Sequence, residues 1–318
     1  MMNTIHVGDA LDVLRTLPDE SVQCVVTSPP YFGLRDYGHD GQIGLESTPD
    51  EFVAALVEVF REVRRVLRDD GTVWLNLGDS YAGGGGHSPN APSSAHSKSG
   101  KYGMALKEGG IKPVGNIKPK DLIGIPWRVA FALQADGWWL RQDIIWHKPN
   151  PMPESVTDRC TKAHEYIFLL SKSARYYYDH EAIKEKSVCE AGTAGDWDGN
   201  IDFNLPNGET RFGKPNLGGS VDGKRNKRDV WQVNTKPFTE AHFAVYPPEL
   251  IEPCVLAGSA EGDTVLDPFS GAGTTGVVAL AKRRTYIGIE LNPTYAEMAA
   301  RRIRDEAPMF NAVKIETR

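Results

Sequence analysis

The sequence predicts an α/β protein built on a mostly parallel sheet. Three observations favour this class: short apolar strands alternate with helices, a compact β-α-β unit opens the chain, and a glycine-rich turn joins a strand to a helix near the C-terminus. At 318 residues, the chain can form one large domain or one domain that carries an inserted lobe.

Composition and charge exclude several classes of protein. The hydrophobic fraction of 40% and the charged fraction of 25% are typical of globular proteins. There is no signal-peptide pattern, and no apolar run approaches the roughly 18 residues of a membrane span. The four cysteines lack C-x-x-C spacing, so we expect no metal site, no disulfide scaffold and a cytoplasmic location. The net charge of −6 by itself argues against a nucleic-acid partner.

The first half of the chain is expected to supply most of the strands. Apolar runs bounded by turn residues predict strands at 5–8, 22–26, 72–77, 138–146, 165–170 and 176–178. Periodicity and end signals predict helices at 11–17, from Asp50 as N-cap to just before Gly71, and at 126–136. Residues 82–118 are rich in Gly, Ser, Pro and Lys, and we expect a mobile loop there.

The second half begins with a different kind of segment. Residues 180–238 are polar, rich in glycine and weakly periodic, which predicts an insert. Regular structure then returns, with helices expected at 248–257, 274–282 and 293–304 and strands at 264–266 and 286–289. We therefore predict a single domain made of residues 1–179 and 239–318, interrupted by an insert at 180–238.

A glycine-rich turn from Asp267 to Thr275 lies between a predicted strand and a predicted helix. Gly271 and Gly273 allow the backbone to approach a ligand closely, and the helix N-terminus offers free N–H groups. Glu290 ends the next strand, where an acidic side chain can bind ribose hydroxyls. A third glycine and a Gly-Lys-Thr sequence are both missing, so a nucleoside without phosphate fits better than a dinucleotide or a triphosphate. A purely structural turn is the alternative.

The sequence Thr-Ser-Pro-Pro-Tyr at 27–31 directly follows an apolar strand. Its prolines make a stiff corner at the C-terminal end of the strand, where open α/β sheets bind ligands. Ser28 Oγ and the Pro29 carbonyl can accept hydrogen bonds from an exocyclic amino group, which frees the nitrogen lone pair. Tyr31 can stack on a base flipped out of a duplex. Together with Pro30, these are the candidate catalytic residues; the alternative is a rigid turn.

These features resemble the β-class amino-methyltransferases of DNA, which occur in restriction–modification, phage and orphan systems. The similarity covers nearly the whole chain, including Gly8-Asp9, Ser28 to Tyr31, His242 to Ala244, Asp267 to Thr275 and Glu290. It implies a class I S-adenosylmethionine (SAM)-dependent methyltransferase fold. This fold is a Rossmann-like, mostly parallel seven-stranded sheet, circularly permuted so that the cofactor motif follows the catalytic corner.

The resemblance also implies SAM as the cofactor. It implies that Asp9 accepts a hydrogen bond from the adenine amino group, that Phe243 and Phe269 line the pocket, and that Glu290 holds the ribose. From the residues alone, Asp9 is interpreted as a helix N-cap and Phe243 as a core residue. The candidate cofactor-binding residues are Asp9, Phe243, Asp267, Phe269, Gly271, Gly273, Thr274 and Glu290.

Serine at position 28 favours transfer to N4 of cytosine, because in this family Ser-Pro-Pro-Tyr generally accompanies cytosine and Asp-Pro-Pro-Tyr accompanies adenine. Transfer to N6 of adenine stays open as the alternative. Less favoured are an RNA or protein methyltransferase and a DNA-binding protein that has lost catalysis. Attack at cytosine carbon 5 is not expected, since Cys254 lies within an apolar helix ahead of the cofactor motif and is interpreted as a core residue.

Two segments supply candidate DNA contacts. Lys148 and Asn150 belong to a second proline-stiffened corner that follows a predicted strand, and the resemblance implies their contact with DNA, because similar segments of the family lie near the DNA and the flipped base. The predicted insert is locally basic, and its candidates for phosphate or guanine contacts are Arg211, Lys224, Arg225 and Arg228. The expected partner is double-stranded DNA with a short recognition sequence. The resemblance adds a cognate restriction endonuclease and a second copy of the chain as further candidate partners.

Overall fold

The computed structural model describes residues 3–33, 41–82, 117–187, 201–204, 210–213, 223–236, 245–306 and 312–317. Phe243 and nearly all of the predicted loop at 82–118 lie outside the described residues. The chain divides into two compact units. The first contains Met1–Asp179 and Asp229–Arg318, and the second contains His180–Arg228.

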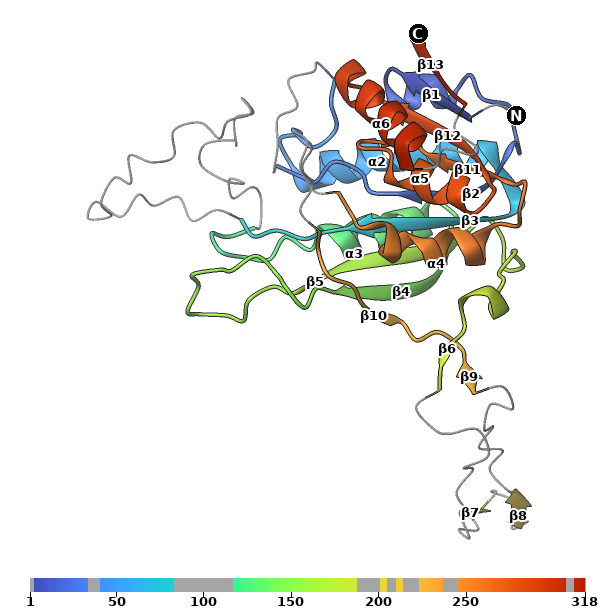
Figure 1. Cartoon of the computed structure of the whole chain (residues 1–318). Helices are drawn as coiled ribbons and strands as arrows, with labels where there is room; N and C mark the ends of the chain where they lie inside the picture. Colours follow the sequence, from blue (N-terminus) through green and yellow to red (C-terminus); the bar gives the residue numbers. More distant parts are fainter. Residues whose placement is uncertain are drawn as a thin grey trace. The chain divides into compact units, whose positions relative to one another are not determined.

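In the described part of the chain, the first unit is built on one nine-stranded sheet (Figure 1). Its strands are β1 (Asn3–Val7), β2 (Val22–Thr27), β3 (Leu67–Leu77), β4 (Trp139–His147), β5 (His164–Ser171), β10 (Val230–Gln232), β11 (Thr264–Asp267), β12 (Thr285–Glu290) and β13 (Val313–Thr317). Their order is β10-β4-β5-β3-β2-β11-β12-β1-β13. Only β5 runs antiparallel to its neighbours. The predicted class, a mostly parallel α/β sheet, is confirmed.

The sheet differs from the prediction in its two outermost strands and in the segment 176–178. The resemblance implies seven strands, and the structure adds β10 and β13 as the two outermost strands. β10 has three residues and β13 has half-exposed, mixed side chains, so neither gave a clear apolar run. The strand predicted at 176–178 is wrong. This segment forms no ladder; the Tyr177 N–H donates to the Asp70 carbonyl at 2.8 Å instead.

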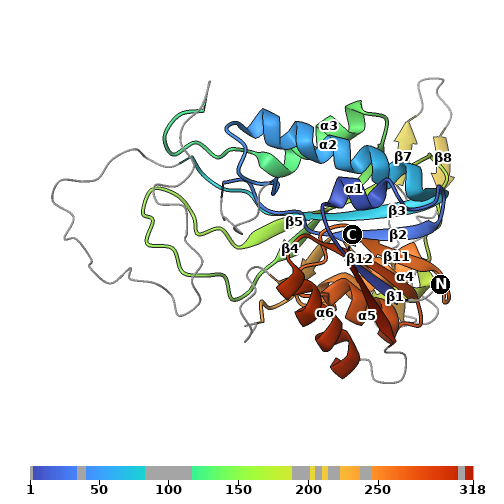
Figure 2. The same ribbon diagram turned by 90° about the horizontal axis from the view of Figure 1, so that it is seen from above.

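Helices cover both faces of this sheet (Figure 2). One face carries α1 (Ala10–Leu14), α2 (Pro49–Val66) and α3 (Ile125–Ala135), and the other carries α4 (Pro248–Gly258), α5 (Thr274–Ala281) and α6 (Pro293–Glu306). The apolar stripe of α2 is buried in the core as its spacing predicts. Its N-cap is Thr48, which forms a capping box with Glu51; Asp50 lies in the first turn. Cys254 is buried in α4.

The order of the strands brings distant parts of the sequence together. β2 pairs in parallel with β11, so Val25 lies opposite Leu266. The C-terminal ends of both strands therefore meet at one edge of the sheet. Because β5 is antiparallel, its first residues lie at this same edge, with His164 opposite His147 at the end of β4. We call this side the catalytic edge.

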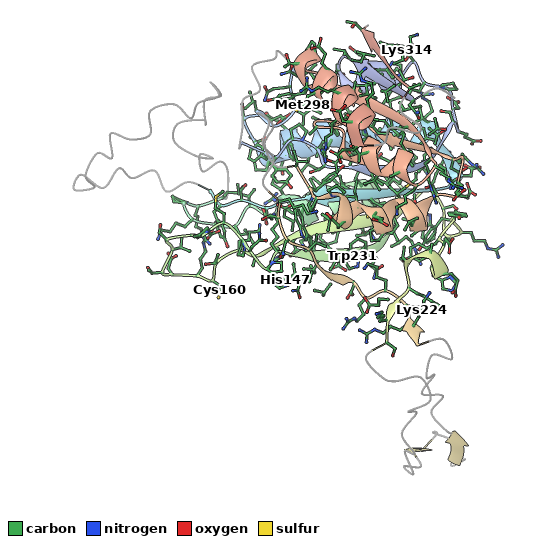
Figure 3. All side chains as sticks on the ribbon, viewed as in Figure 1. His147, Cys160, Lys224, Trp231, Met298 and Lys314 are labelled. Atoms are coloured by element: carbon green, nitrogen blue, oxygen red, sulfur yellow. The ribbon has the colours of Figure 1, made fainter. Side chains whose placement is uncertain are left out.

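In its described residues, the second unit consists of a short 3₁₀ turn, η1 (Glu181–Ile183), and two small antiparallel sheets of two strands each. β6 (Glu185–Lys186) pairs with β9 (Lys224–Arg225), and β7 (Ile201–Asn204) pairs with β8 (Thr210–Gly213). The insert was predicted to end at 238, but Asp229 already belongs to the first unit. β10 pairs with β4 there, and Trp231, labelled in Figure 3, lies 6.5 Å from Trp74, ring centroid to ring centroid. Within the described residues, no helix is long and apolar enough to cross a membrane.

Candidate active site

The glycine-rich turn after β11 depends on two glycines in left-handed conformations. Gly271 has a φ of 51° and Gly273 has a φ of 72°, a region that side chains disfavour. A Cβ atom at Gly273 would also lie only 2.8 Å from the Cβ atom of Ala299 in α6. Gly273 is the N-cap of α5, so the turn presents the start of this helix to the pocket.

Glu290 at the end of β12 closes the turn from the other side. Its Oε2 accepts a hydrogen bond from the Gly271 N–H at 2.8 Å, and its Oε1 accepts one from the Asn292 N–H at 2.9 Å. Burial raises the pKa of this carboxyl to about 7, although the two N–H donors act in the opposite direction. Glu290 can therefore change its protonation state near neutral pH.

Asp267 connects the glycine turn to the strand that carries the corner. Its carboxylate accepts hydrogen bonds from Thr27 Oγ1 at 2.6 Å, from Thr275 Oγ1 at 2.7 Å and from the Phe269 N–H at 3.0 Å. Burial raises its pKa, and these donors oppose the rise. With 1% exposure, Asp267 supports the turn from behind and does not line the pocket.

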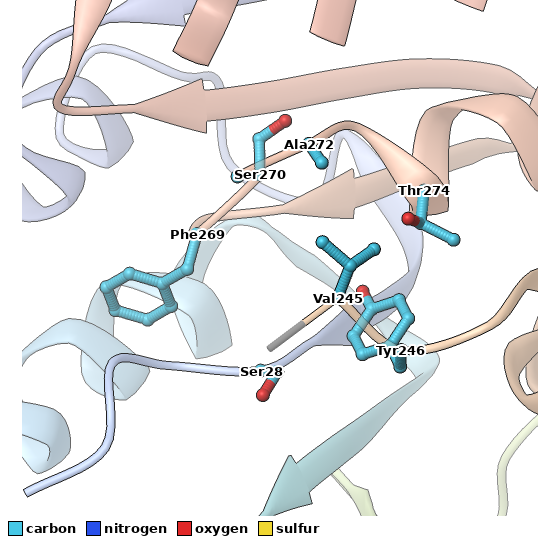
Figure 4. Close-up of a pocket in the computed structure, with 8 residues that line it drawn as sticks. Ser28, Val245, Tyr246, Phe269, Ser270, Ala272 and Thr274 are labelled. Atoms are coloured by element: carbon cyan, nitrogen blue, oxygen red, sulfur yellow. The ribbon is translucent and has the colours of Figure 1, made fainter. Parts of the chain in front are cut away.

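One pocket contains both predicted motifs (Figure 4). It has a volume of about 300 Å³, and its lining residues are Ser28, Val245, Tyr246, Phe269, Ser270, Gly271, Ala272 and Thr274. Ser28 comes from the corner, and five of the others come from the glycine turn. The structure thus brings together two motifs that lie about 240 positions apart in the chain.

The pocket also contains residues that sequence reasoning missed. Val245 and Tyr246 follow Phe243, the only aromatic residue named from that segment. The Tyr246 hydroxyl lies 2.6 Å from Thr275 Oγ1 and donates to Asp267 at 3.3 Å, so it belongs to the same buried network. Thr274 Oγ1 accepts from Arg302 Nη1 at 2.8 Å.

The proline corner leads into a polar cluster that was also missed. Pro29 is buried, and the Tyr31 hydroxyl donates to Glu165 Oε2 at 2.8 Å. The other oxygen of Glu165 is paired with the Lys148 ammonium group. Glu165 could have been found only by knowing that β5 runs antiparallel, which puts its first residues at the catalytic edge.

Asp9 has the geometry of a helix N-cap. Its Oδ1 accepts hydrogen bonds from the N–H groups of Leu11 at 2.9 Å and Asp12 at 3.1 Å. The preceding Gly8 N–H donates to the Glu290 carbonyl at 3.0 Å, so Asp9 lies beside the end of β12. The contact of Asp9 with an adenine stays a prediction, and that of Phe243 falls outside the described residues.

Comparison with known proteins identifies the family. The family model described as DNA methylase matches residues 22–301. The chain belongs to the DNA methylase family. Among its relatives, the Type II methyltransferase M.Cfr9I of Citrobacter freundii is 51% identical over 95% of this chain and 88% of its own length. M.SmaI of Serratia marcescens is 49% identical over 94% of this chain and 90% of its own length. The predicted resemblance to DNA amino-methyltransferases is confirmed.

Solved structures of similar fold agree with this family. A Thermus thermophilus protein described as a DNA modification methylase, in complex with S-adenosyl-L-methionine, has a TM-score of 0.60 and 26% identity, covering 100% of both chains. The PvuII DNA methyltransferase, described as cytosine-N4-specific, has a TM-score of 0.62 over 99% of this chain and 95% of its own. At 18% identity, it shows the fold alone.

In this DNA methylase, several candidate DNA contacts already have protein partners. The Lys148 ammonium lies 4.2 Å from the centre of the Trp146 ring as well as beside Glu165. The Asn150 amide accepts from the Thr235 N–H at 2.9 Å and donates to the Thr235 carbonyl at 3.1 Å, which joins two loops. His147, labelled in Figure 3, ends β4 and directly precedes Lys148 in the chain.

The basic candidates of the second unit surround one carboxylate. Arg225 and Arg228 both donate to Glu185 Oε1, at 2.9 and 2.6 Å, so two cations share a single anion. Lys224 is exposed on β9. Arg211 lies on β8, where only the backbone is described. Contacts of these residues with DNA stay predictions.

Proposed function

We propose that this DNA methylase transfers a methyl group from S-adenosylmethionine to the N4 amino group of cytosine within a short sequence of duplex DNA. The observation that carries this proposal is the shared pocket of Ser28 and the glycine turn. An amino group bound at the corner, which receives the methyl group, and a methyl donor bound at the turn are then in contact, as direct transfer requires. Serine at position 28 supports cytosine over adenine.

The residues of the pocket fit a nucleoside that carries a sulfonium and no phosphate. None of the described lining residues is a lysine or an arginine, and the Phe269 ring offers an apolar wall. Glu290 carries the carboxylate that would hold the ribose hydroxyls, and Asp9 lies beside it for the adenine amino group. When bound, S-adenosylmethionine supplies the methyl group from its positively charged sulfur.

The corner residues act on the base. Ser28 Oγ and the Pro29 carbonyl accept the two amino hydrogens, which localises the nitrogen lone pair and directs it toward the methyl group. Tyr31 stacks on the flipped base and holds its amino group at the corner. The proton released from nitrogen leaves through the hydrogen bond to one of these acceptors or to water.

Binding of the surrounding DNA falls to the candidate cations. Lys148 lies at the catalytic edge, with Asn150 two residues further along the chain. Arg211, Lys224, Arg225 and Arg228 would neutralise phosphates or read guanine edges. Since the chain resembles the methyltransferases of restriction–modification systems and its relatives are named Type II methyltransferases, we also propose a cognate endonuclease that recognises the same sequence.

The test is to express the gene in a bacterial host without DNA methylation and to map modified bases by sequencing. We expect N4-methylcytosine at one short motif, and we expect the signal to vanish for Tyr31→Ala while the protein still binds S-adenosylmethionine. Detection of N6-methyladenine at the motif would reject cytosine as the target base in favour of the alternative, adenine. No modified base, with the cofactor bound normally, would reject the proposed reaction.

A further inference from the structure

A largely buried ionic cluster beside the corner is not explained by the reaction itself. It consists of Tyr31, Asn76, Lys148 and Glu165. The side chains of Glu165 and Lys148 are only 14% and 18% exposed, and Asn76 is buried. Moving an ion pair away from water carries a desolvation penalty that often exceeds its stabilising effect. A cluster of this kind at the catalytic edge therefore calls for a role besides stability.

The contacts fix the carboxylate of Glu165 from three strands. Tyr31, just beyond β2, donates to Oε2 at 2.8 Å, and Asn76 of β3 donates to the same oxygen at 3.3 Å. The Asn76 amide also donates to the Tyr166 carbonyl at 3.0 Å, which orients it. Lys148, just beyond β4, pairs with Oε1. Both oxygens of Glu165 thus have partners: Oε2 accepts hydrogen bonds from Tyr31 and Asn76, and Oε1 is paired with the Lys148 ammonium group.

The ring of Tyr31 is confined by the backbone as well. A Cβ atom at Gly78 would lie 2.7 Å from Tyr31 Cε2 and 3.4 Å from Glu165 Cδ. The edge of the ring therefore rests against the chain just beyond β3, while its hydroxyl is held by Glu165. Only a glycine at position 78 permits both contacts.

We infer that Glu165 is a positioning residue, which holds the ring of Tyr31 in the orientation that stacks on the target base, with Lys148 and Asn76 keeping its carboxylate in place. The inference rests on the proposed function, since it concerns the ring that receives the flipped base. A ring fixed in advance gives up little side-chain entropy when DNA binds, so the base reaches Ser28 in one geometry.

A double-mutant cycle tests this role. The variants are Tyr31→Phe, Glu165→Gln and the two combined, measured by single-turnover methyl transfer on a duplex that carries the mapped motif. We expect each single variant to slow transfer about tenfold, with the S-adenosylmethionine concentration that gives half the maximal single-turnover rate nearly unchanged. We expect the double variant to be no slower than the slower single one. Rates that multiply, to about a hundredfold, would overturn the inference.

The matched control is Asp136→Asn. Asp136 is also an ion-paired carboxylate, bonded to Arg61 and 17% exposed, but it lies at the end of α3, near the start of β4 and the opposite edge of the sheet. We expect its transfer rate to equal that of the unaltered protein. Equal slowing of Asp136→Asn and Glu165→Gln would mean that Glu165 acts through general stability, which also overturns the inference.

The fluorescence of a base analogue and the variant Gly78→Ala, which leaves the ion pair of Glu165 and Lys148 in place, provide a second test. With 2-aminopurine at the target position, stacking on Tyr31 should quench the emission of the flipped base. Glu165→Gln and Gly78→Ala should therefore both raise the emission at saturating protein, and unchanged emission in both would reject the role. Should Glu165→Gln not fold, Gly78→Ala decides alone. An inactive unaltered protein would instead reject the proposed function and this inference together.

Discussion

The two sides of the pocket are held together in different ways. On the side of the glycine turn, which would bind the methyl donor and is called the donor side here, most of these hydrogen bonds are local: Phe269 bonds to Asp267 two residues away, Thr275 to Asp267 eight residues away and Gly271 to Glu290 nineteen residues away. The exception is Thr275 Oγ1, which also donates to the Val26 carbonyl of β2 at 3.2 Å. On the corner side, they span the fold. Tyr31 reaches Glu165 across 134 positions, and Thr27 reaches Asp267 across 240. The donor side is formed mainly by residues close together in the sequence, whereas the corner side is held by bonds between different strands of the sheet.

This difference predicts different consequences for mutations. Changes within the glycine turn should disturb a mainly local set of contacts and weaken binding of the methyl donor. Changes in the long-range bonds should leave donor binding largely intact and slow the transfer, because they alter how the corner meets the turn. Measurements on three residues, Gly273, Thr27 and Glu290, would separate the two sides or show that they act as one.

The greatest loss is expected from Gly273→Ala, with Gly262→Ala as its matched control. Both glycines have positive φ, 72° and 88°, so alanine strains the backbone at both by about 1 kcal/mol. A Cβ atom at 273 would also collide with Ala299, whereas nothing lies within 4 Å of one at 262. We expect about 2 kcal/mol of additional destabilisation in Gly273→Ala on denaturant unfolding, and loss of S-adenosylmethionine binding. An equal loss of stability in the two variants would contradict the close packing of the turn against Ala299.

An intermediate loss is expected from Thr27→Val, which keeps the shape of the side chain and removes the bond to Asp267. Hydrogen bonds to charged groups contribute about 1.5–3 kcal/mol to stability. Losing about 2 kcal/mol of this interaction from the alignment of the transition state corresponds to a roughly thirtyfold fall in kcat, which is what we expect. The KM for S-adenosylmethionine should change less than about threefold, because the turn keeps its local bonds. Thr264→Val, at the start of β11, serves as the control. A raised KM with normal kcat would place Thr27 on the donor side.

A modest change with pH is expected from Glu290. Because burial raises its pKa to about 7, the carboxylate becomes ionised as pH rises through neutrality. The ionised form is the stronger acceptor for ribose hydroxyls, so S-adenosylmethionine should bind about threefold more tightly at pH 8 than at pH 6. The free protein should respond in the opposite sense. Its folded state holds a proton that the unfolded state releases near pH 4.5, so its stability falls as pH rises toward 7.

Glu290→Gln is the control for both responses. Titration calorimetry from about pH 6 to 8, the range around the raised pKa, and thermal unfolding from pH 4.5 to about 7, the range between the unfolded and folded pKa values, should both show flat profiles for this variant wherever the unaltered protein shows a slope. A slope of the same size in the variant would assign the pH dependence to another group.

Prediction from sequence succeeded where neighbours in the chain are neighbours in space. The stripe of α2 and the glycine turn were each found from spacing alone, because periodicity and turn chemistry act over a few residues. The strand predicted at 176–178 failed because an apolar, aromatic run does not reveal whether a ladder partner exists. Asp9 caps α1, as was interpreted from the residues alone, and Asp267 is buried behind the turn; their expected contacts with the cofactor stay predictions.

The class of fold, the proline corner and the donor turn follow from the amino-acid sequence alone, since each is encoded in contiguous residues with fixed backbone preferences. The groups that surround Tyr31, and the bond that joins Thr27 to Asp267, emerge only when the chain has folded. Glu165 reaches the catalytic edge because β5 runs antiparallel, and strand direction is set by the packing of the whole sheet. No local pattern around residue 165 contains that information.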